Sequence, residues 1–177
     1  MSYRFYSGNA DHIKERIENG TLDIGLLPEP VDIARYEFLR MPVMEEWGVL
    51  TREDSPLTAL EVVRPQDLVG RPLMVSGREL VQNELANWLG DDAQRLNILI
   101  RYNLLYNIAM LVKSGFGDAL CIRLDCVYPG LRFIPLSPPL RLGSVLVWKK
   151  QQITPPAVGA LIAHTKQYLE SISDHIQ

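Results

Sequence analysis

Short apolar strands and amphipathic helices alternate along this sequence, and that alternation restricts the chain to α/β folds. At three places a predicted strand runs directly into a polar helix start: Tyr3 to Ser7 before Gly8-Asn9, Leu73 to Val75 before Ser76-Gly77-Arg78-Glu79, and Leu96 to Arg101 before Tyr102-Asn103. A helix N-terminus has unpaired N–H groups and a partial positive charge, so each turn suits a carboxylate or another anion. The pattern indicates a protein that binds small molecules.

Two proline-rich breaks, at residues 52–72 and 135–139, interrupt this alternation. Such breaks are typical of crossovers between lobes. They predict a first lobe of residues 1–52 and 136–177, which includes strands at 36–44 and 47–51, and a second lobe of residues 53–135. Because open α/β sheets bind ligands at the carboxyl ends of their strands, the three turns are expected to face one cleft.

Composition excludes several functional classes. The 177 residues are 47% hydrophobic, enough for one large or two small domains, and the net charge of −3 gives no basic surplus for binding a nucleic-acid backbone. The longest apolar runs are too short to cross a bilayer, and the first residues lack the apolar region of a signal peptide. A cytoplasmic protein without a membrane partner is therefore expected.

The sequence contains no residue set that indicates catalysis. His12, His164 and His175 are scattered, and no Ser/His/Asp set or nucleotide-binding glycine loop accompanies them. Cys121 and Cys126 could pair or bind a metal, but no further Cys or His cluster lies near them, so two free thiols are expected. We expect no enzymatic activity, no cofactor and no metal site.

Five stretches occur in a characteristic order: FYSGNADHIKERIENGTLDIGLL, MPVMEEWGVLTREDSPL, QDLVGRPLMVS, LVKSGFGDALC, and LVWKK followed shortly by TPPAVGALI. The first contains a G-x-apolar-Asp-apolar-Gly signature from Gly20 to Gly25, and the fourth a V-x-x-G-x-G turn from Val112 to Gly117. In this order and spacing, the stretches resemble the effector-binding domain of LysR-type transcriptional regulators.

The resemblance implies an α/β fold of the periplasmic-binding-protein type II kind, with two Rossmann-like lobes joined by two crossover segments. It also implies a small metabolite in the interlobe cleft, with a carboxylate as one option, and a homodimer or tetramer of the full-length protein. DNA would be bound only by an N-terminal winged helix-turn-helix, which this sequence does not contain. The family's domain ordinarily opens with one more strand and helix before the segment that matches Tyr3 to Ser7, so the first lobe is expected to be truncated at its N-terminus. The alternative is a transporter's solute-binding protein, which shares the fold but ordinarily carries an export signal.

The cleft geometry that the resemblance implies places ten residues near the effector: Ser7, Gly8, Asn9, Pro28, Glu29, Ser76, Gly77, Arg78, Asn103 and Tyr106. Where some relatives carry a basic residue, this chain has Pro28 and Glu29, and the glutamate disfavours a strongly anionic effector.

Each candidate also has a structural alternative. Asn9 could cap a helix as well as bind a ligand, and Ser76 could form a capping box with the glutamate three residues later. Arg78 could pair with a carboxylate or remain a solvated surface residue. Asn103 could be only a helix cap, and Tyr106 could pack in the core.

Overall fold

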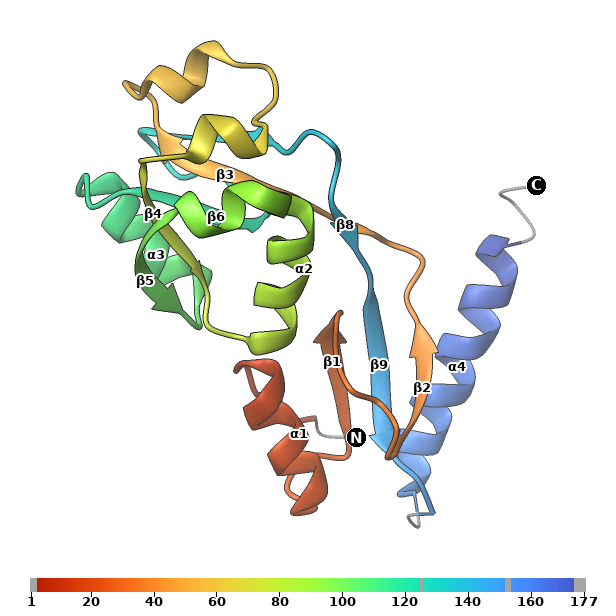
Figure 1. Ribbon diagram of the computed structural model, residues 1–177. Helices are drawn as coiled ribbons and strands as arrows, with labels where there is room; N and C mark the ends of the chain where they lie inside the picture. The colour runs from red at the N-terminus through yellow and green to blue at the C-terminus, as the bar shows by residue number, and fades with distance from the viewer. Residues whose placement is uncertain (1–2, 125, 152–153, 174–177) are drawn as a thin grey trace. The chain divides into compact units, whose positions relative to one another are not determined.

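The computed structural model describes residues 3–124, 126–151 and 154–173 of the chain (Figure 1). Its contacts divide the chain into two units. Unit 1 comprises Met1–Met44 and Gly143–Gln177, and unit 2 comprises Glu45–Leu142. The first unit thus combines both ends of the chain, whereas the second is one continuous segment.

The sheet of unit 1 has three antiparallel strands, with β9 (Ser144–Lys149) between β1 (Ile24–Pro28) and β2 (Tyr36–Arg40). Helix α1 (Ala10–Glu18) packs against one face of this sheet, and the long helix α4 (Pro156–Ser173) completes the unit (Figure 1). A Cβ at Gly25 would lie 2.6 Å from a methyl carbon of Ile13, so the glycine allows α1 to approach β1 closely. The core between them consists of Ala10, Ile13, Ile17, Leu27, Tyr36, Val145 and Val147.

The strand predicted from Tyr3 to Ser7 is wrong. Within the described part of the chain this segment pairs with no other strand, and Phe5 is 94% exposed. An isolated extended segment leaves its backbone groups to water, so an apolar alternating pattern alone does not make it a strand. The segment is held to α1 instead, because the guanidinium of Arg16 stacks 4.1 Å from the ring centroid of Tyr6.

Unit 2 is built on a larger mixed sheet. Its strands follow the order β5 (Asn97–Tyr102), β4 (Pro72–Ser76), β6 (Asp118–Ile122), β3 (Glu45–Arg52) and β7 (Leu131–Pro135), and the short β8 (Arg141–Leu142) pairs with the start of β3. Strand β4 is parallel to both β5 and β6, while β3 is antiparallel to β6 and β7. The connections include three short 3₁₀ turns, η1 (Pro56–Ala59), η2 (Pro65–Leu68) and η3 (Gly90–Arg95).

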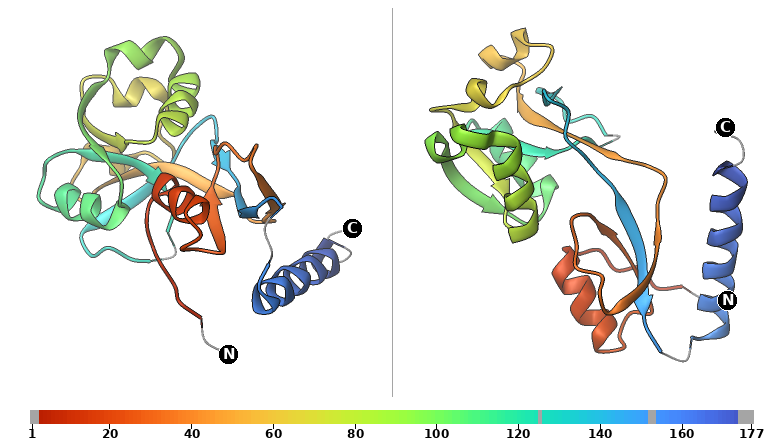
Figure 2. Two further views of the ribbon diagram at one scale, coloured as in Figure 1. Left: turned by 90° about the horizontal axis from the view of Figure 1, so that it is seen from below. Right: turned by 45° about the vertical axis from the view of Figure 1, so that its right-hand side comes forward.

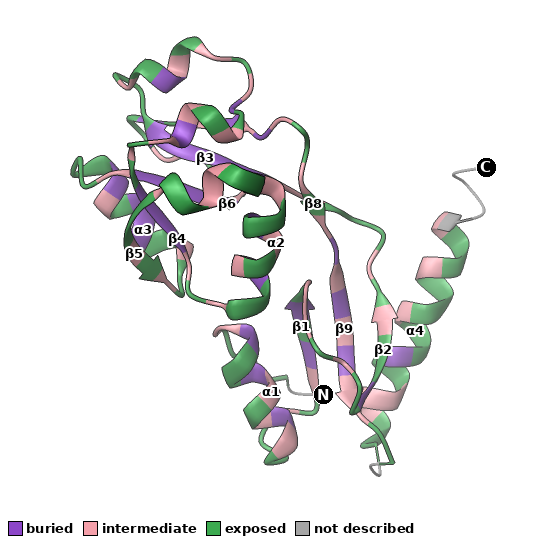
Figure 3. Cartoon of the chain, viewed as in Figure 1, coloured by how far each residue is buried: buried purple, intermediate pink, exposed green. Residues whose placement is uncertain are grey.

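Two helices cover opposite faces of this sheet (Figure 2). Helix α2 (Glu79–Leu89) contributes Val81, Leu85 and Leu89 to one apolar cluster, and α3 (Leu105–Lys113) contributes Ile108, Ala109 and Val112 to the other. Neighbouring residues of β3 and β6 alternate between the two clusters, so these strands are buried along most of their length (Figure 3).

The boundaries between the units differ from those predicted for the lobes. Residues 45–52 and 136–142, expected in the first lobe, belong by their contacts to unit 2. The reason is the length of β3, which pairs with β6 from Trp47 to Leu50 and with β7 from Gly48 to Arg52. Proline-rich breaks mark turns in a chain, but ladder hydrogen bonds decide to which sheet a strand belongs.

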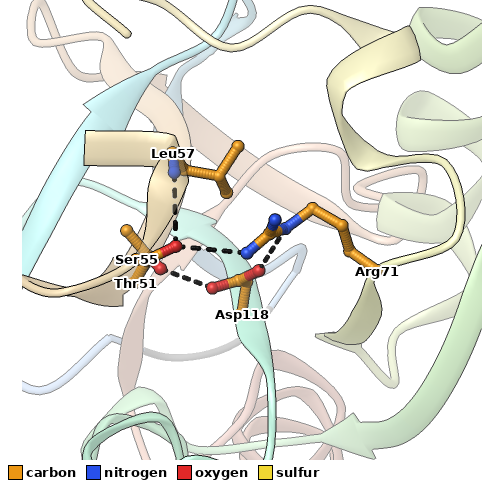
Figure 4. A network of polar contacts seen from close by, with 5 residues as sticks. All are labelled: Thr51, Ser55, Leu57, Arg71 and Asp118. Atoms are coloured by element: carbon orange, nitrogen blue, oxygen red, sulfur yellow. Dashed lines mark hydrogen bonds and ion pairs between the residues drawn. The ribbon is translucent and has the colours of Figure 1, made fainter. Parts of the chain in front are cut away.

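A partly buried polar network connects the end of β3, the start of β6 and Arg71, the residue before β4 (Figure 4). Asp118 accepts a hydrogen bond from the Thr51 hydroxyl and an ion-paired one from Arg71 Nε at 2.7 Å. Arg71 also donates to the Ser55 hydroxyl at 3.1 Å, which in turn accepts from the Leu57 N–H. Since Asp118 begins β6 beside Leu73, the network lies at the amino ends of the parallel strands.

Candidate functional site

The carboxyl ends of β4 and β5 lie side by side in unit 2. The two strands pair in parallel up to Ser76 opposite Tyr102. The helices that follow them, α2 and α3, leave toward opposite faces of the sheet. In open α/β sheets, ligands bind outside strand ends where successive loops diverge in this way. The residues around these two strand ends therefore form the candidate site.

The loop after β4 carries three of the predicted residues. Ser76 ends the strand, Gly77 follows, and Arg78 is the N-cap of α2 without a side-chain cap hydrogen bond. The predicted capping box is wrong, because the helix begins at Glu79 and the Ser76 hydroxyl instead accepts from the Arg78 N–H at 3.3 Å. The N-cap residue of α2 therefore provides no side-chain cap for the first turn.

The loop after β5 carries the other two predicted residues of unit 2. Leu104, not Asn103, is the N-cap of α3, so the interpretation of Asn103 as the helix cap is wrong. Tyr106 lies in the first turn and is 65% exposed, so it is not a core residue. Like α2, α3 begins without a side-chain cap hydrogen bond. The structure therefore brings Ser76, Gly77 and Arg78 together with the strand end that leads to Asn103 and Tyr106.

The electrostatics of this edge favour an anionic group. Two uncapped helix N-termini start here, and each has a partial positive charge. Two arginines also lie at this edge: Arg78 at the start of α2 and Arg101 near the end of β5. The Arg101 guanidinium donates a hydrogen bond to the Gln82 side chain of α2 at 3.4 Å. One acidic side chain, Glu79, lies in the first turn of α2 and none in the first turn of α3.

Sequence reasoning missed Tyr102, the residue that links the two loops. Its carbonyl accepts a hydrogen bond from the Gly77 N–H at 2.7 Å, and its hydroxyl donates to the carbonyl of Leu120 at 2.8 Å. Burial raises the pKa of Tyr102, so its hydroxyl remains a proton donor. A tyrosine closing an apolar strand was the available signal, since a buried phenol needs a hydrogen-bond partner.

In unit 1, the start of α1 carries Ser7, Gly8 and Asn9. Asn9 is the N-cap of α1, and its side-chain oxygen accepts from the His12 N–H at 2.8 Å. Its structural alternative is thus confirmed, while its contact with an effector stays a prediction. A Cβ at Gly8 would lie 3.0 Å from the Tyr6 ring, so this turn is closely packed by its own neighbours.

Pro28 and Glu29 stand at the end of β1. The Glu29 carboxylate contacts neighbouring residues of unit 1. One oxygen lies 3.5 Å from Arg40 Nε, and the other lies 2.5 Å from the position that a Cβ at Gly143 would take. The Glu29 N–H also donates to the Gly143 carbonyl at 2.8 Å. Glu29 therefore fastens the end of β1 to the start of β9.

A shallow hollow that is open to solvent lies elsewhere in unit 1, at the start of α4. Asp23, Trp148, Lys149, Thr154, Pro155 and Val158 line it, and none of these belongs to the predicted set. Lys149 is already engaged with the backbone carbonyl of Glu18 at 3.1 Å.

The described residues contain no group of three or more His, Cys, Asp or Glu side chains placed to hold a metal ion. No helix among them is long and apolar enough for a membrane span. Cys121 is buried and Cys126 is exposed, and both are free thiols.

Comparisons with known proteins agree on one family. A family model described as LysR substrate binding domain matches residues 1–170. The effector binding domain of QuiR, solved in complex with shikimate, superposes with a TM-score of 0.80 at 17% identity, over 93% of this chain and 80% of that one. The C-terminal domain of a probable LysR family transcriptional regulator from Rhodococcus sp. RHA1 gives 0.77 at 18% identity, over 93% and 84%.

HinK, a LysR family transcriptional regulator from Pseudomonas aeruginosa, gives a TM-score of 0.70 at 19% identity over 87% of this chain. This chain spans only 56% of HinK, and 61% of a second Pseudomonas aeruginosa chain, the PA01 protein. No curated protein matches in sequence. The likenesses confirm the expected fold, which is α/β and of the periplasmic-binding-protein type II kind.

Proposed function

This chain belongs to the LysR substrate binding domain family, and on that premise we propose that it senses a small-molecule effector for a longer transcriptional regulator. Binding of the effector would alter how that regulator acts on its DNA, through a winged helix-turn-helix outside this sequence. The family match favours this function over a transporter's solute-binding protein. The proposal places the regulator in the cytoplasm, assembled as a homodimer or tetramer, and assigns it no enzymatic step.

One observation supports the effector site above all others: two helices with uncapped N-termini start from adjacent parallel strands. Two helix dipoles then start close to each other, which stabilises a carboxylate or a polarised oxygen without any cofactor. The exposed Tyr106 adds a flat apolar surface with a hydroxyl at its tip, and this suits a small ring.

We propose a carboxylate as the effector class. Arg78 begins α2, and a guanidinium can hold a carboxylate through two parallel hydrogen bonds. The QuiR domain was solved with shikimate, a carboxylate, although at 17% identity that likeness carries only the fold. From unit 1, the proposal assigns effector contacts to Ser7, Gly8, Asn9, Pro28 and Glu29, as expected from the sequence.

A thermal-shift screen over central metabolites, with shikimate included, tests the proposal. A ligand that binds only the folded protein raises its apparent stability, by about 2.7 kcal/mol at a hundred times its dissociation constant. We expect one or more carboxylates to raise the Tm and their uncharged amides to have no effect. A screen in which no carboxylate shifts the Tm, with the protein folded, would contradict the proposal.

The Arg78→Ala variant then tests the site itself. Losing a charged hydrogen-bond donor should weaken binding of an active carboxylate on the order of 10- to 100-fold by calorimetry. Arg95→Ala is the matched control, because Arg95 lies on η3 and pairs with Asp92 at 2.9 Å. Equal affinities of both variants and the wild type would remove Arg78 from the site.

A further inference from the structure

Tyr102 is the last residue of the edge strand β5, and it makes hydrogen bonds to the loop after β4 and to β6. Its carbonyl holds the Gly77 N–H just beyond β4 at 2.7 Å, and its hydroxyl reaches the Leu120 carbonyl of β6 at 2.8 Å. Because β4 lies between β5 and β6, the side chain spans the end of a third strand to make the second bond.

The hydrogen bond from Tyr102 to Leu120 lies where the pairing between β4 and β6 ends. Strand β4 remains paired with β5 as far as Ser76 opposite Tyr102, but its pairing with β6 ends at Met74 opposite Ala119. Beyond Met74, β4 therefore follows β5 and has no ladder to β6. The Tyr102 hydroxyl adds a link from β5 to β6 next to the end of this pairing.

The loop after β4 is fitted closely to Tyr102. A Cβ at Gly77 would lie 3.3 Å from the Tyr102 carbonyl oxygen, tighter than an ordinary contact. The Tyr102 ring packs against the apolar cluster on the α3 face, which fixes the direction of the hydroxyl. One residue thus sets the position of the Ser76–Arg78 loop and of the chain that continues to Asn103 and Tyr106.

We propose that Tyr102 is a positioning residue that fixes the separation of these two loops and thereby the width of the effector site. This inference rests on the proposed function. It assigns the positioning role to the phenol hydroxyl and not to the packing of the ring. A Tyr102→Phe variant should therefore fold but bind effector less well.

Tyr102→Phe tests the inference by two measurements. Amide hydrogen exchange followed by NMR should show the Gly77 N–H exchanging at least fivefold faster than in the wild type, with the β3 amides unchanged. Isothermal titration with shikimate should show at least fivefold weaker binding. Tyr128→Phe is the matched control, since Tyr128 packs against the same cluster but belongs to neither of the two loops.

Unchanged Gly77 exchange in Tyr102→Phe, or faster exchange with unchanged shikimate affinity, would overturn the inference. An equal loss of affinity in Tyr128→Phe would also overturn it, because the effect would then come from the core. Gly77→Ala disturbs the same contact from the other loop and should likewise weaken binding. The exchange measurement needs no ligand, so Gly77 exchange decides whether Tyr102 couples the loops even if the wild-type protein binds no shikimate. Failure of the proposed function is seen separately, in a screen in which no carboxylate shifts the Tm.

Discussion

The two units use their polar side chains in opposite ways. In unit 1 they close both ends of α1: Asn9 caps the start, and Lys149 donates to the Glu18 carbonyl at the end. In unit 2 the helices α2 and α3 begin without side-chain caps, and the strongest polar network, around Asp118, lies at the other end of the sheet. Polar groups that already satisfy the backbone stabilise the fold, whereas backbone groups left open are available to a ligand.

The same contrast appears in the cores. Unit 2 has one apolar cluster on each face of its sheet, while the cluster of unit 1 lies on the α1 face. Leu26, on β1, is 56% exposed. The two clusters and the Asp118 network at the opposite end of the sheet stabilise unit 2, although α2 and α3 begin without side-chain caps.

Asp118→Ala should have the largest effect, because it removes the acceptor on which the network of unit 2 depends. The buried Thr51 hydroxyl and the partly buried Arg71 guanidinium would lose their acceptor, which costs about 2–4 kcal/mol of unfolding free energy, somewhat less than for a fully buried ion pair. Urea denaturation followed by circular dichroism measures the loss. Asp54→Ala is the control, because Asp54 forms an exposed pair with Arg52. Equal stability of the two variants would show that the network contributes no more than a surface pair.

Helix caps provide a sharper test of the contrast. Asn9→Ala should cost about 1 kcal/mol, because it leaves the His12 N–H of α1 without its acceptor. Ser76→Ala should change stability by less than about 0.5 kcal/mol, since Ser76 is not a helix cap. Chemical denaturation of both variants, with Asn9→Asp as a capping control, measures the difference. A larger loss in Ser76→Ala than in Asn9→Ala would reverse the comparison.

Much of the second unit could be predicted from local pattern. The apolar runs before Ser76 and Tyr102 gave the positions of β4 and β5, and the spacing of Val81 and Leu85 gave the buried face of α2. These signals are strong because each element meets its partners over many consecutive residues. Parallel strands then bring their carboxyl ends to one edge by geometry alone, so adjacent loops could be expected to form a site.

Features that depend on distant partners could not be predicted in this way. Ser76 has the sequence of a capping box, but its pairing opposite Tyr102 extends β4 and moves the helix start to Glu79. The segment from Tyr3 has the pattern of a strand, but it has no neighbour among the described residues. The Tyr102 hydroxyl bonds a residue 18 positions away, and no local pattern reports such a contact.

The smallest predicted effect concerns pH and the polar end of α1. Burial, and then the neighbouring Glu18 carboxylate, raise the pKa of Tyr36 from 10.0 to about 12. Below pH 10 the phenol is protonated in both the folded and the unfolded chain, so its contribution to stability is complete. Between pH 10 and 12 the unfolded chain releases this proton while the folded one retains it, so stability falls as pH rises.

Denaturation of the wild type and Tyr36→Phe across this range should show a shallower fall in the variant. Glu18→Gln removes the second cause but leaves the burial, so its slope should lie between the two; a slope equal to that of Tyr36→Phe would mean that the carboxylate, rather than burial, controls the titration in unit 1.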